Sequence, residues 1–157
     1  KKKPLSPKVF PKRISFNLIP QIDNFVESGD TKEEKKMIDE TQKIFDCKIE
    51  VFATCVRVPV FVGHAESIYI ETKKKIDLKK LITKIKKFPG LSLVDEQIDG
   101  GYVTPDESAG EDEVFISRIR VRDLNKMSLW VVADNLRKGA ALNSIQIGEL
   151  LIKKYMK

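Results

Sequence analysis

The stretch VFISRIRV, residues 114–121, indicates the kind of fold, because apolar and polar residues alternate along it. Successive side chains of a β-strand point to opposite faces of the sheet. The alternation therefore predicts a strand with Phe115, Ile119 and Val121 on one face and the two arginines of the stretch on the other.

Further strands are predicted on both sides of this stretch. The runs concerned are rich in Val, Ile, Phe and Thr, the residues that favour a pleated, half-buried surface. They lie at residues 14–19, 49–62, 67–72, 91–94 and 128–133.

Three segments have the apolar periodicity of amphipathic helices. The first, roughly residues 31–45, opens with Thr31 and Glu34 at the spacing of a capping box, in which the two side chains satisfy each other's free backbone amides. The second begins after Asp77, which can cap it, and stops at Pro89-Gly90. The third, about residues 136–155, has an apolar face so broad that it suggests burial against more than one surface.

This order of elements predicts a single α+β domain, residues 1–157, with a mixed, largely antiparallel sheet. A chain of this length can bury a real core. Residues 1–13 are rich in Pro and Lys and are expected to form an irregular lead-in.

Composition excludes several classes of protein. No apolar run approaches the roughly 20 residues that a membrane span requires, and no apolar signal core follows the basic amino terminus, so an intracellular location is expected. Two cysteines and one histidine are too few for a disulfide framework or a zinc site. No glycine-rich turn of the dinucleotide-binding or Walker type follows a predicted strand, so nothing in the sequence indicates pyrophosphate binding.

The net charge of +6 raises the question of nucleic acid. Lysines crowd residues 73–87, but aromatic residues suited to base stacking do not interleave with them. A solvated helix face is the preferred interpretation.

His64 and Arg57 are the first candidates for chemistry. His64 is the only side chain whose ordinary pKa lies near neutrality, which makes it a candidate for proton transfer. Arg57 lies seven residues earlier, and Pro59 and Gly63 could bend the chain so that both reach one substrate. On spacing alone, a surface histidine and a salt-bridged arginine are the favoured alternative.

Glu33, Lys36 and Cys55 are weaker candidates on spacing alone. Glu33 and Lys36 lie three apart at the start of the first predicted helix, where such a pair is normally a surface ion pair worth about 0.3 kcal/mol. Cys55 lies in an apolar run and is expected to be a small buried residue, not a nucleophile.

Eight short segments, in order, resemble one enzyme family. They are FNLIPQID (16–23), TKEE (31–34), ET-x-KI (40–44), CVRVPV (55–60), GHAES (63–67), TP (104–105), SRIR (117–120) and DNLRKGAALN (134–143). Each segment alone is a weak match, but the ordered set is specific, and it resembles aspartate-semialdehyde dehydrogenase from about residue 9 to the end of the chain.

The resemblance implies an activity and a set of site residues. The family interconverts aspartyl phosphate and aspartate semialdehyde with NADPH and phosphate, on the route to lysine, methionine and threonine. By resemblance, His64 is the acid/base histidine, and Arg57 binds the substrate carboxylate, a planar anion that suits a bidentate guanidinium. Glu33 receives the substrate ammonium group, Lys36 belongs to the phosphate site, and Asn135 lies near the nicotinamide of NADP.

The resemblance covers the carboxy-terminal catalytic and dimerisation domain of that family. Its fold is that of the catalytic half of glyceraldehyde-phosphate-dehydrogenase-like enzymes, a sheet with helices on one face and a second subunit on the other. It implies a cytoplasmic homodimer, with residues 114–121 as the candidate contact surface. The last helix, residues 136–155, is expected to pack on the cofactor domain.

Parts of the family pattern do not occur in the sequence. These are the Asn-Cys-[Ser/Thr] string of the nucleophile, the glycine-rich cofactor domain, and the glutamine that holds the substrate. We therefore expect this chain alone to bind NADP weakly or not at all and not to turn over substrate. The alternative hypotheses are a non-catalytic dimerisation or assembly module and a basic nucleic-acid-binding domain.

Overall fold

The computed structural model describes residues 9–156 and contains two compact units, one ending at Pro59 and the other beginning at Val60. Of the lead-in predicted at residues 1–13, residues 1–8 lie outside this description, and residues 9–13 contain neither helix nor strand. The two units are described separately below.

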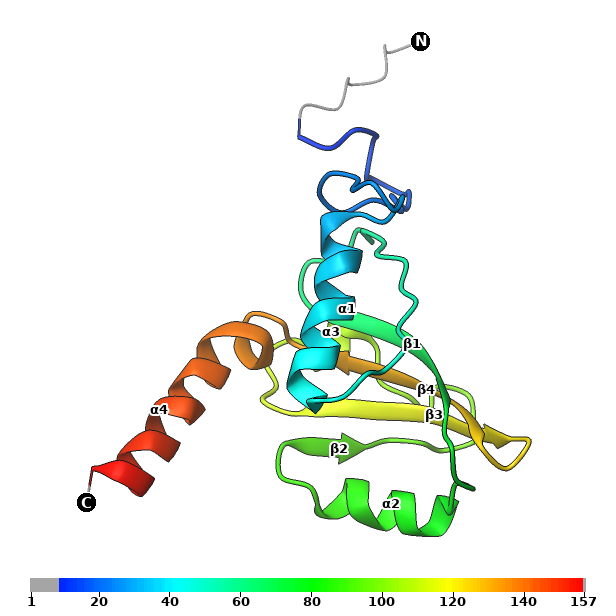
Figure 1. Cartoon of the computed structure of the whole chain (residues 1–157), viewed down its shortest axis with the longest axis vertical. Helices are drawn as coiled ribbons and strands as arrows, with labels where there is room; N and C mark the ends of the chain where they lie inside the picture. The colour runs from blue at the N-terminus through cyan, green and yellow to red at the C-terminus, as the bar shows by residue number, and fades with distance from the viewer. Residues whose placement is uncertain (1–8, 157) are drawn as a thin grey trace. The chain divides into compact units, whose positions relative to one another are not determined.

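The second unit is built on a four-stranded sheet (Figure 1). Its strands are β1 (His64–Glu71), β2 (Leu91–Leu93), β3 (Val114–Arg122) and β4 (Lys126–Ala133). They lie in the order β1-β4-β3-β2, with β4 antiparallel to both of its neighbours and β2 parallel to β3. The predicted α+β class with a mixed, largely antiparallel sheet is confirmed.

Helix α2 (Leu78–Lys87) covers one face of this sheet. The predicted cap is present, because the Asp77 side chain accepts the backbone N–H of Lys80 at 3.0 Å. The apolar stripe of α2 meets the sheet in a core whose buried members are Ile85, Ile116, Ile119 and Met127. Burial of this stripe is what holds the helix, since isolated helices of this length are marginal in water.

A β-bulge in β3 changes which residues face that core. Arg118 has a φ of 58°, and the pairing with β4 shifts between Ser117 and Arg120. The strand therefore presents both Ile116 and Ile119 to the core, whereas strict alternation would separate them. The prediction that Phe115 shares a face with Ile119 was wrong, because the extra residue of the bulge reverses the alternation between them.

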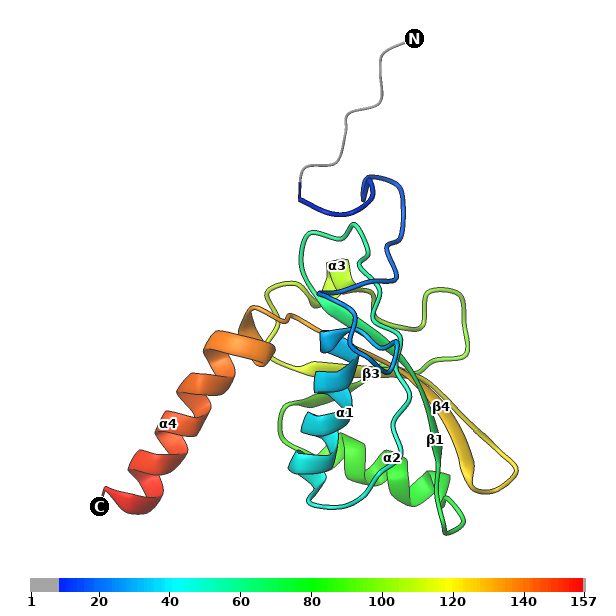
Figure 2. The same cartoon turned by 45° about the horizontal axis from the view of Figure 1, so that its top comes forward.

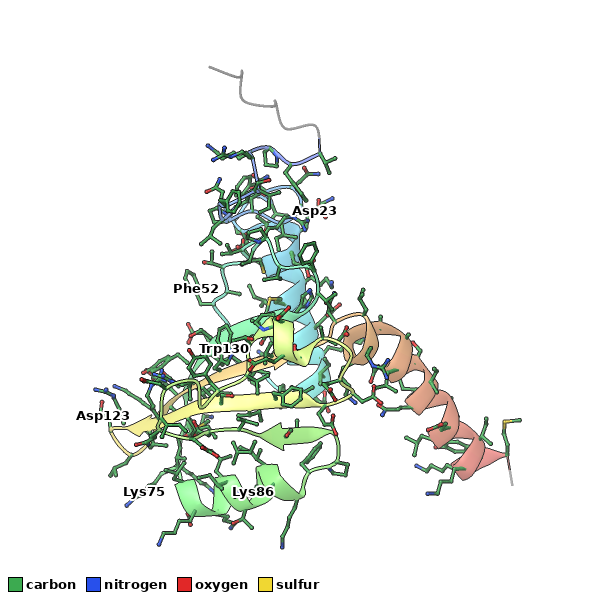
Figure 3. The ribbon with its side chains drawn as sticks, turned by 180° about the vertical axis from the view of Figure 1, so that it is seen from behind. Asp23, Phe52, Lys75, Lys86, Asp123 and Trp130 are labelled. Carbon is green, nitrogen blue, oxygen red and sulfur yellow. The ribbon has the colours of Figure 1, made fainter. Side chains whose placement is uncertain are left out.

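The opposite face of the sheet is partly covered by the chain around Val103. The Trp130 indole donates to the carbonyl of Val103 at 2.8 Å, and the N–H of Val103 donates to Ser117 Oγ at 3.2 Å. Trp130 is labelled in Figure 3. A single-turn helix, α3 (Pro105–Ser108), follows and places Pro105 beside Gly63, the residue before β1.

The last part of the second unit is helical, as predicted. A π-helical turn, η1 (Arg137–Ala141), continues into α4 (Leu142–Tyr155), and both Figure 1 and Figure 2 show α4 directed away from the sheet. Apolar side chains along α4, among them Ile145 and Ile152, are exposed. Across residues 9–156, no helix has the length and apolar character needed to cross a membrane.

The first unit contains α1 (Lys32–Phe45), and its predicted capping box is present at Thr31 and Glu34. The strands predicted at residues 14–19 and 49–62 do not form, since the two segments pair only at an isolated bridge between Ile19 and Arg57. One reason is local, because Phe16 has a φ of 54° and cannot continue an extended strand.

Candidate functional site

The five predicted site residues are divided between the two units. Glu33, Lys36 and Arg57 belong to the first unit, and His64 and Asn135 belong to the second. Each group forms a local arrangement of its own.

Glu33 and Lys36 form an ion pair on the first two turns of α1. Lys36 Nζ lies 3.2 Å from Glu33 Oε1 and 3.5 Å from Glu33 Oε2, and both side chains are partly exposed. The hydrogen bond and the negative charge of Glu33 raise the pKa of Lys36. The predicted shared face is therefore present, with one acidic and one cationic group side by side.

The backbone of Arg57 is paired with the backbone of Ile19. Its N–H donates to the Ile19 carbonyl at 2.9 Å, and its carbonyl accepts the Ile19 N–H at 3.1 Å. The guanidinium lies 5.2 Å from the centre of the Phe10 ring. Within residues 9–156 no carboxylate forms a salt bridge with Arg57, so the salt-bridged arginine considered from the sequence is not observed.

Glu34 contributes a contact that sequence reasoning missed. Its side chain is 6% exposed, and its two carboxylate oxygens have different partners. Oε2 accepts the N–H of Thr31 at 2.6 Å, whereas Oε1 accepts the N–H of Cys55 at 2.8 Å. These backbone hydrogen bonds lower the pKa of Glu34 and keep it ionised. The capping box was visible in the sequence, but the bond to Cys55, 21 residues away, carries no local signal.

Cys55 is buried, as its apolar neighbours predicted. Its Sγ lies 3.4 Å from Met37 Sδ, one turn along α1 from Glu34. A buried thiol in such surroundings packs as a small hydrophobe.

His64 is the first residue of β1, where its backbone pairs with Ala133 of β4. The turn before it depends on Gly63, which has a φ of 103°. A Cβ at Gly63 would also lie 3.1 Å from Pro105 Cβ. The Gly63 N–H donates to Asn135 Oδ1 at 3.0 Å, so the Asn135 side chain holds the turn that presents His64.

An open pocket of ≈ 220 Å³ brings His64 and Asn135 together. The rest of its lining is Glu66 of β1, apolar side chains of β3 and β4, and Lys138 and Gly139 of η1. The structure thus places an imidazole, a carboxylate, a primary amide and an ammonium group around one open hollow. π-Helical turns occur frequently at functional sites, which agrees with the position of η1.

Asp134 anchors the chain at this pocket and was also missed from the sequence. It is 4% exposed. Its Oδ2 accepts the Gly110 N–H at 2.8 Å, and its Oδ1 accepts the N–H groups of Leu136 at 2.8 Å and Arg137 at 3.2 Å. These hydrogen bonds lower the pKa of Asp134, and the bond from Gly110 has the largest effect. A recognisable signal was present, since Asp is favoured where its side chain can accept the first N–H groups of a helix.

The basic residues around α2 form a separate surface in the second unit. An open hollow of ≈ 600 Å³ lies there, and its lining residues are Lys80, Thr83, Lys84, Lys87, Phe88 and Pro89. Figure 3 labels Lys86 of α2 and Lys75, which precedes the helix. Throughout the described chain, no group of His, Cys, Asp or Glu residues is placed to hold a metal ion.

Comparisons with known proteins agree on one family. Residues 1–138 match the family described as semialdehyde dehydrogenase, dimerisation domain. An aspartate-semialdehyde dehydrogenase of Shewanella sp. strain DB6705 is 49% identical over 156 residues, which cover 97% of this chain and 46% of that protein. That of Aquifex aeolicus is 50% identical over 148 residues, covering 92% and 44%.

A solved structure supports the same relationship. Aspartate semialdehyde dehydrogenase II of Vibrio cholerae, complexed with ASA, superposes with a TM-score of 0.90 at 44% identity, over 97% of this chain and 46% of that chain. The chain thus spans about half the length of the curated relatives it matches.

Proposed function

The chain belongs to the semialdehyde dehydrogenase dimerisation-domain family, and we propose that it supplies the substrate-anchoring and acid–base side of an aspartate-semialdehyde dehydrogenase. The proposed reaction is the NADPH-dependent reductive dephosphorylation of aspartyl phosphate to aspartate semialdehyde, on the route to lysine, methionine and threonine. The Vibrio cholerae relative was solved in complex with ASA, which supports this choice of substrate. The reaction also fits the cytoplasmic location expected from the sequence.

Arg57 is the proposed anchor of the substrate carboxylate. The observation that carries the proposal is its guanidinium, which forms no salt bridge within residues 9–156 although the backbone on which it sits is fixed by two hydrogen bonds. A guanidinium on a fixed backbone, with no carboxylate partner among the described residues, is suited to bidentate binding of an external carboxylate. Glu33 is the proposed partner of the substrate ammonium group. Lys36, whose pKa is raised by Glu33, is the proposed partner of phosphate.

His64 is the proposed acid/base residue. It lines an open pocket at the start of β1, where a substrate can reach the imidazole. In the proposed cycle it takes the proton of the enzyme's thiol, whose thiolate displaces phosphate from the acyl phosphate. It later serves the oxygen that becomes the carbonyl of the semialdehyde. The Asn-Cys-[Ser/Thr] string of the family's nucleophile does not occur in these residues, so the thiol is proposed to come from elsewhere in the enzyme.

NADP would meet this chain only at its nicotinamide end. Asn135 lines the pocket with His64, and because its Oδ1 accepts from Gly63, its amide N–H groups are the ones that remain for a carboxamide oxygen. The bound cofactor supplies the hydride. No glycine-rich phosphate loop occurs in the sequence, so we expect other residues of the enzyme to hold the pyrophosphate.

A homodimer is proposed from the family description. β3 is paired with β4 over most of its length and with β2 at residues 114–116, so we propose that a second subunit meets β3 through a face of the sheet. The available face is the one opposite α2, where Tyr69, Arg120 and Ser128 occupy neighbouring register positions. The exposed apolar side chains of α4 are the proposed contact with the cofactor domain.

The test is an assay on the polypeptide produced from the complete gene. Phosphate-dependent formation of NADPH from NADP and aspartate semialdehyde is expected. Arg57→Lys should raise the KM for aspartate semialdehyde about 10- to 100-fold, since a lysine cannot form the bidentate contact. His64→Asn should lower kcat by about 10² to 10⁴, the usual contribution of a general acid/base.

The control is Arg122→Lys, an exposed arginine at the end of β3, which should leave both constants unchanged. Absence of NADPH formation by the wild-type polypeptide would refute the proposed dehydrogenase activity and favour a non-catalytic assembly module. An unchanged KM in Arg57→Lys would refute the role of Arg57.

A further inference from the structure

Glu34 makes one hydrogen bond more than a helix cap needs. A second capping box in the chain, Thr104 with Glu107, shows the difference. There a single oxygen, Glu107 Oε2, accepts both the N–H and the hydroxyl of Thr104, each at 2.7 Å, and Glu107 is exposed. Glu34 is buried and uses Oε2 for the cap and Oε1 for the N–H of Cys55, which belongs to a different part of the first unit.

The bond from Cys55 joins two segments that carry proposed substrate-binding residues. On one side, Glu34 follows Glu33 directly and lies two residues before Lys36. On the other side, Cys55 lies two residues before Arg57. One hydrogen bond therefore connects the helix turn that carries the acid and the lysine to the segment that carries the arginine.

Neighbouring contacts show that this connection is specific. The Cys55 side chain meets Met37, which lies three residues after Glu34 and so on the same face of α1. The Arg57 backbone pairs with Ile19, which is 2% exposed. The segment is thus held at residues 55 and 57, and of these two contacts the one at Cys55 reaches α1. Earlier in the same stretch of chain, Gln42 of α1 also donates to the Ile49 carbonyl at 2.9 Å.

We propose that Glu34 is a positioning residue, which ties the Cys55–Arg57 segment to the first turn of α1 and thereby sets the guanidinium of Arg57 relative to Glu33 and Lys36. The role rests on the proposed function, because it assumes that these three side chains hold one substrate together with phosphate. Small errors in such a placement have large effects, since a displacement of about 1 Å can cost about 100-fold in rate.

The carboxylate is required because both of its oxygens face N–H donors. A glutamine has one carbonyl oxygen and one amide group, and in the place of Glu34 its amide would meet a second donor. The same change at Glu107 leaves one oxygen to accept both bonds. Glu34→Gln and Glu107→Gln are therefore a matched pair, in which only the first is expected to break a tertiary connection.

The experiment compares this pair in the complete enzyme. Glu34→Gln should raise the KM for aspartate semialdehyde about 10-fold or more, with a smaller change in the KM for NADP, and should speed hydrogen exchange at the Cys55 amide about 10-fold or more. Glu107→Gln should leave all three at their wild-type values. If Glu34→Gln does not fold, Cys55→Pro takes its place, because it removes the donor and leaves Glu34 and its cap intact.

The outcomes separate the two proposals. Active wild-type enzyme with the same KM for aspartate semialdehyde in Glu34→Gln and Glu107→Gln overturns the positioning role and leaves the proposed function standing. Wild-type enzyme without turnover overturns the proposed function and the positioning role with it. A raised KM that accompanies faster exchange at the Cys55 amide in Glu34→Gln supports the role, as does a raised KM in Cys55→Pro, which has no amide hydrogen at residue 55.

Discussion

At the scale of single residues, a buried carboxylate organises the backbone beside the candidate residues of each unit. Glu34 binds two backbone N–H groups in the first unit, and Asp134 binds three in the second. Ionised acceptors make stronger hydrogen bonds than neutral ones, which is why a carboxylate can hold several donors without a cationic partner. Asp134 immediately precedes Asn135, so the stability of this anchor bears directly on the turn before His64.

Asp134→Asn should destabilise the protein in a pH-dependent way. The folded-state pKa of Asp134 is depressed. Ionised Asp134 therefore contributes fully to the free energy of unfolding above the pKa that it has in the unfolded chain. This contribution is lost as the pH falls through its lowered folded-state pKa. Urea unfolding should show a lower midpoint for the variant at neutral pH, by several tenths of a molar, and a difference that shrinks as the pH falls below the usual pKa of an aspartate.

Asp99→Asn, at an exposed aspartate of the same unit, is the control and should change the midpoint little at neutral pH. A difference between Asp134→Asn and wild type that stays constant across the pH range would contradict this account of Asp134.

At the scale of elements, β3 shows how one backbone irregularity reorganises a face. The bulge turns Ile119 inward, and the Asp95 carboxylate accepts its N–H, with Oδ2 at 3.2 Å. Arg118 carries the positive φ of this bulge. A left-handed conformation costs a residue with a Cβ about 1–2 kcal/mol, a cost that glycine avoids.

Arg118→Gly and Arg122→Gly should have different effects on stability. At residue 118 the relief of the left-handed conformation offsets the entropy that glycine loses on folding, so the free energy of unfolding should be unchanged or up to about 1 kcal/mol higher. At Arg122, which lies in β3 outside the bulge, the same change should cost about 0.5–1 kcal/mol. Thermal unfolding of both variants measures the difference, and equal destabilisation would show that the bulge is not as described.

At the scale of the second unit, α4 is a helix whose apolar side chains remain exposed to solvent. Ile145 and Ile152 are each 59% exposed and lie seven residues apart, on one face of the helix. Apolar surface left in water favours association with another surface. In the complete enzyme the proposed cofactor domain provides that surface.

Replacing Ile145 and Ile152 by Gln should affect the chain and the complete enzyme differently. In this chain alone, self-association measured by sedimentation should decrease, with little change in the unfolding midpoint, because neither residue belongs to the core. In the complete enzyme the same pair should lower stability by about 1–3 kcal/mol, since burial of such side chains contributes at that level.

Glu149→Gln, at an exposed position of the same helix, is the control for both measurements. An unchanged stability of the complete enzyme in the Ile145 and Ile152 variant would contradict the proposed packing of α4.

Local pattern determined much of this molecule. The capping box at Thr31, the cap at Asp77 and the apolar stripes behind them predicted α1 and α2. The alternating or apolar runs at residues 67–72, 91–94, 114–121 and 128–133 predicted the strands of the sheet, and the order of short motifs indicated the family. These features could be read because a cap or a period depends on residues within one or two turns of each other.

Only the tertiary structure decided which other segments these elements contact. The runs at residues 14–19 and 49–62 have strand-like composition but pair at one bridge, because strand formation requires a partner that composition does not specify. The bond between Glu34 and Cys55 spans 21 residues, and that between Gly63 and Asn135 spans 72. Such contacts depend on how the chain packs. The sequence could therefore nominate candidate site residues, whereas packing decided which backbone groups hold them.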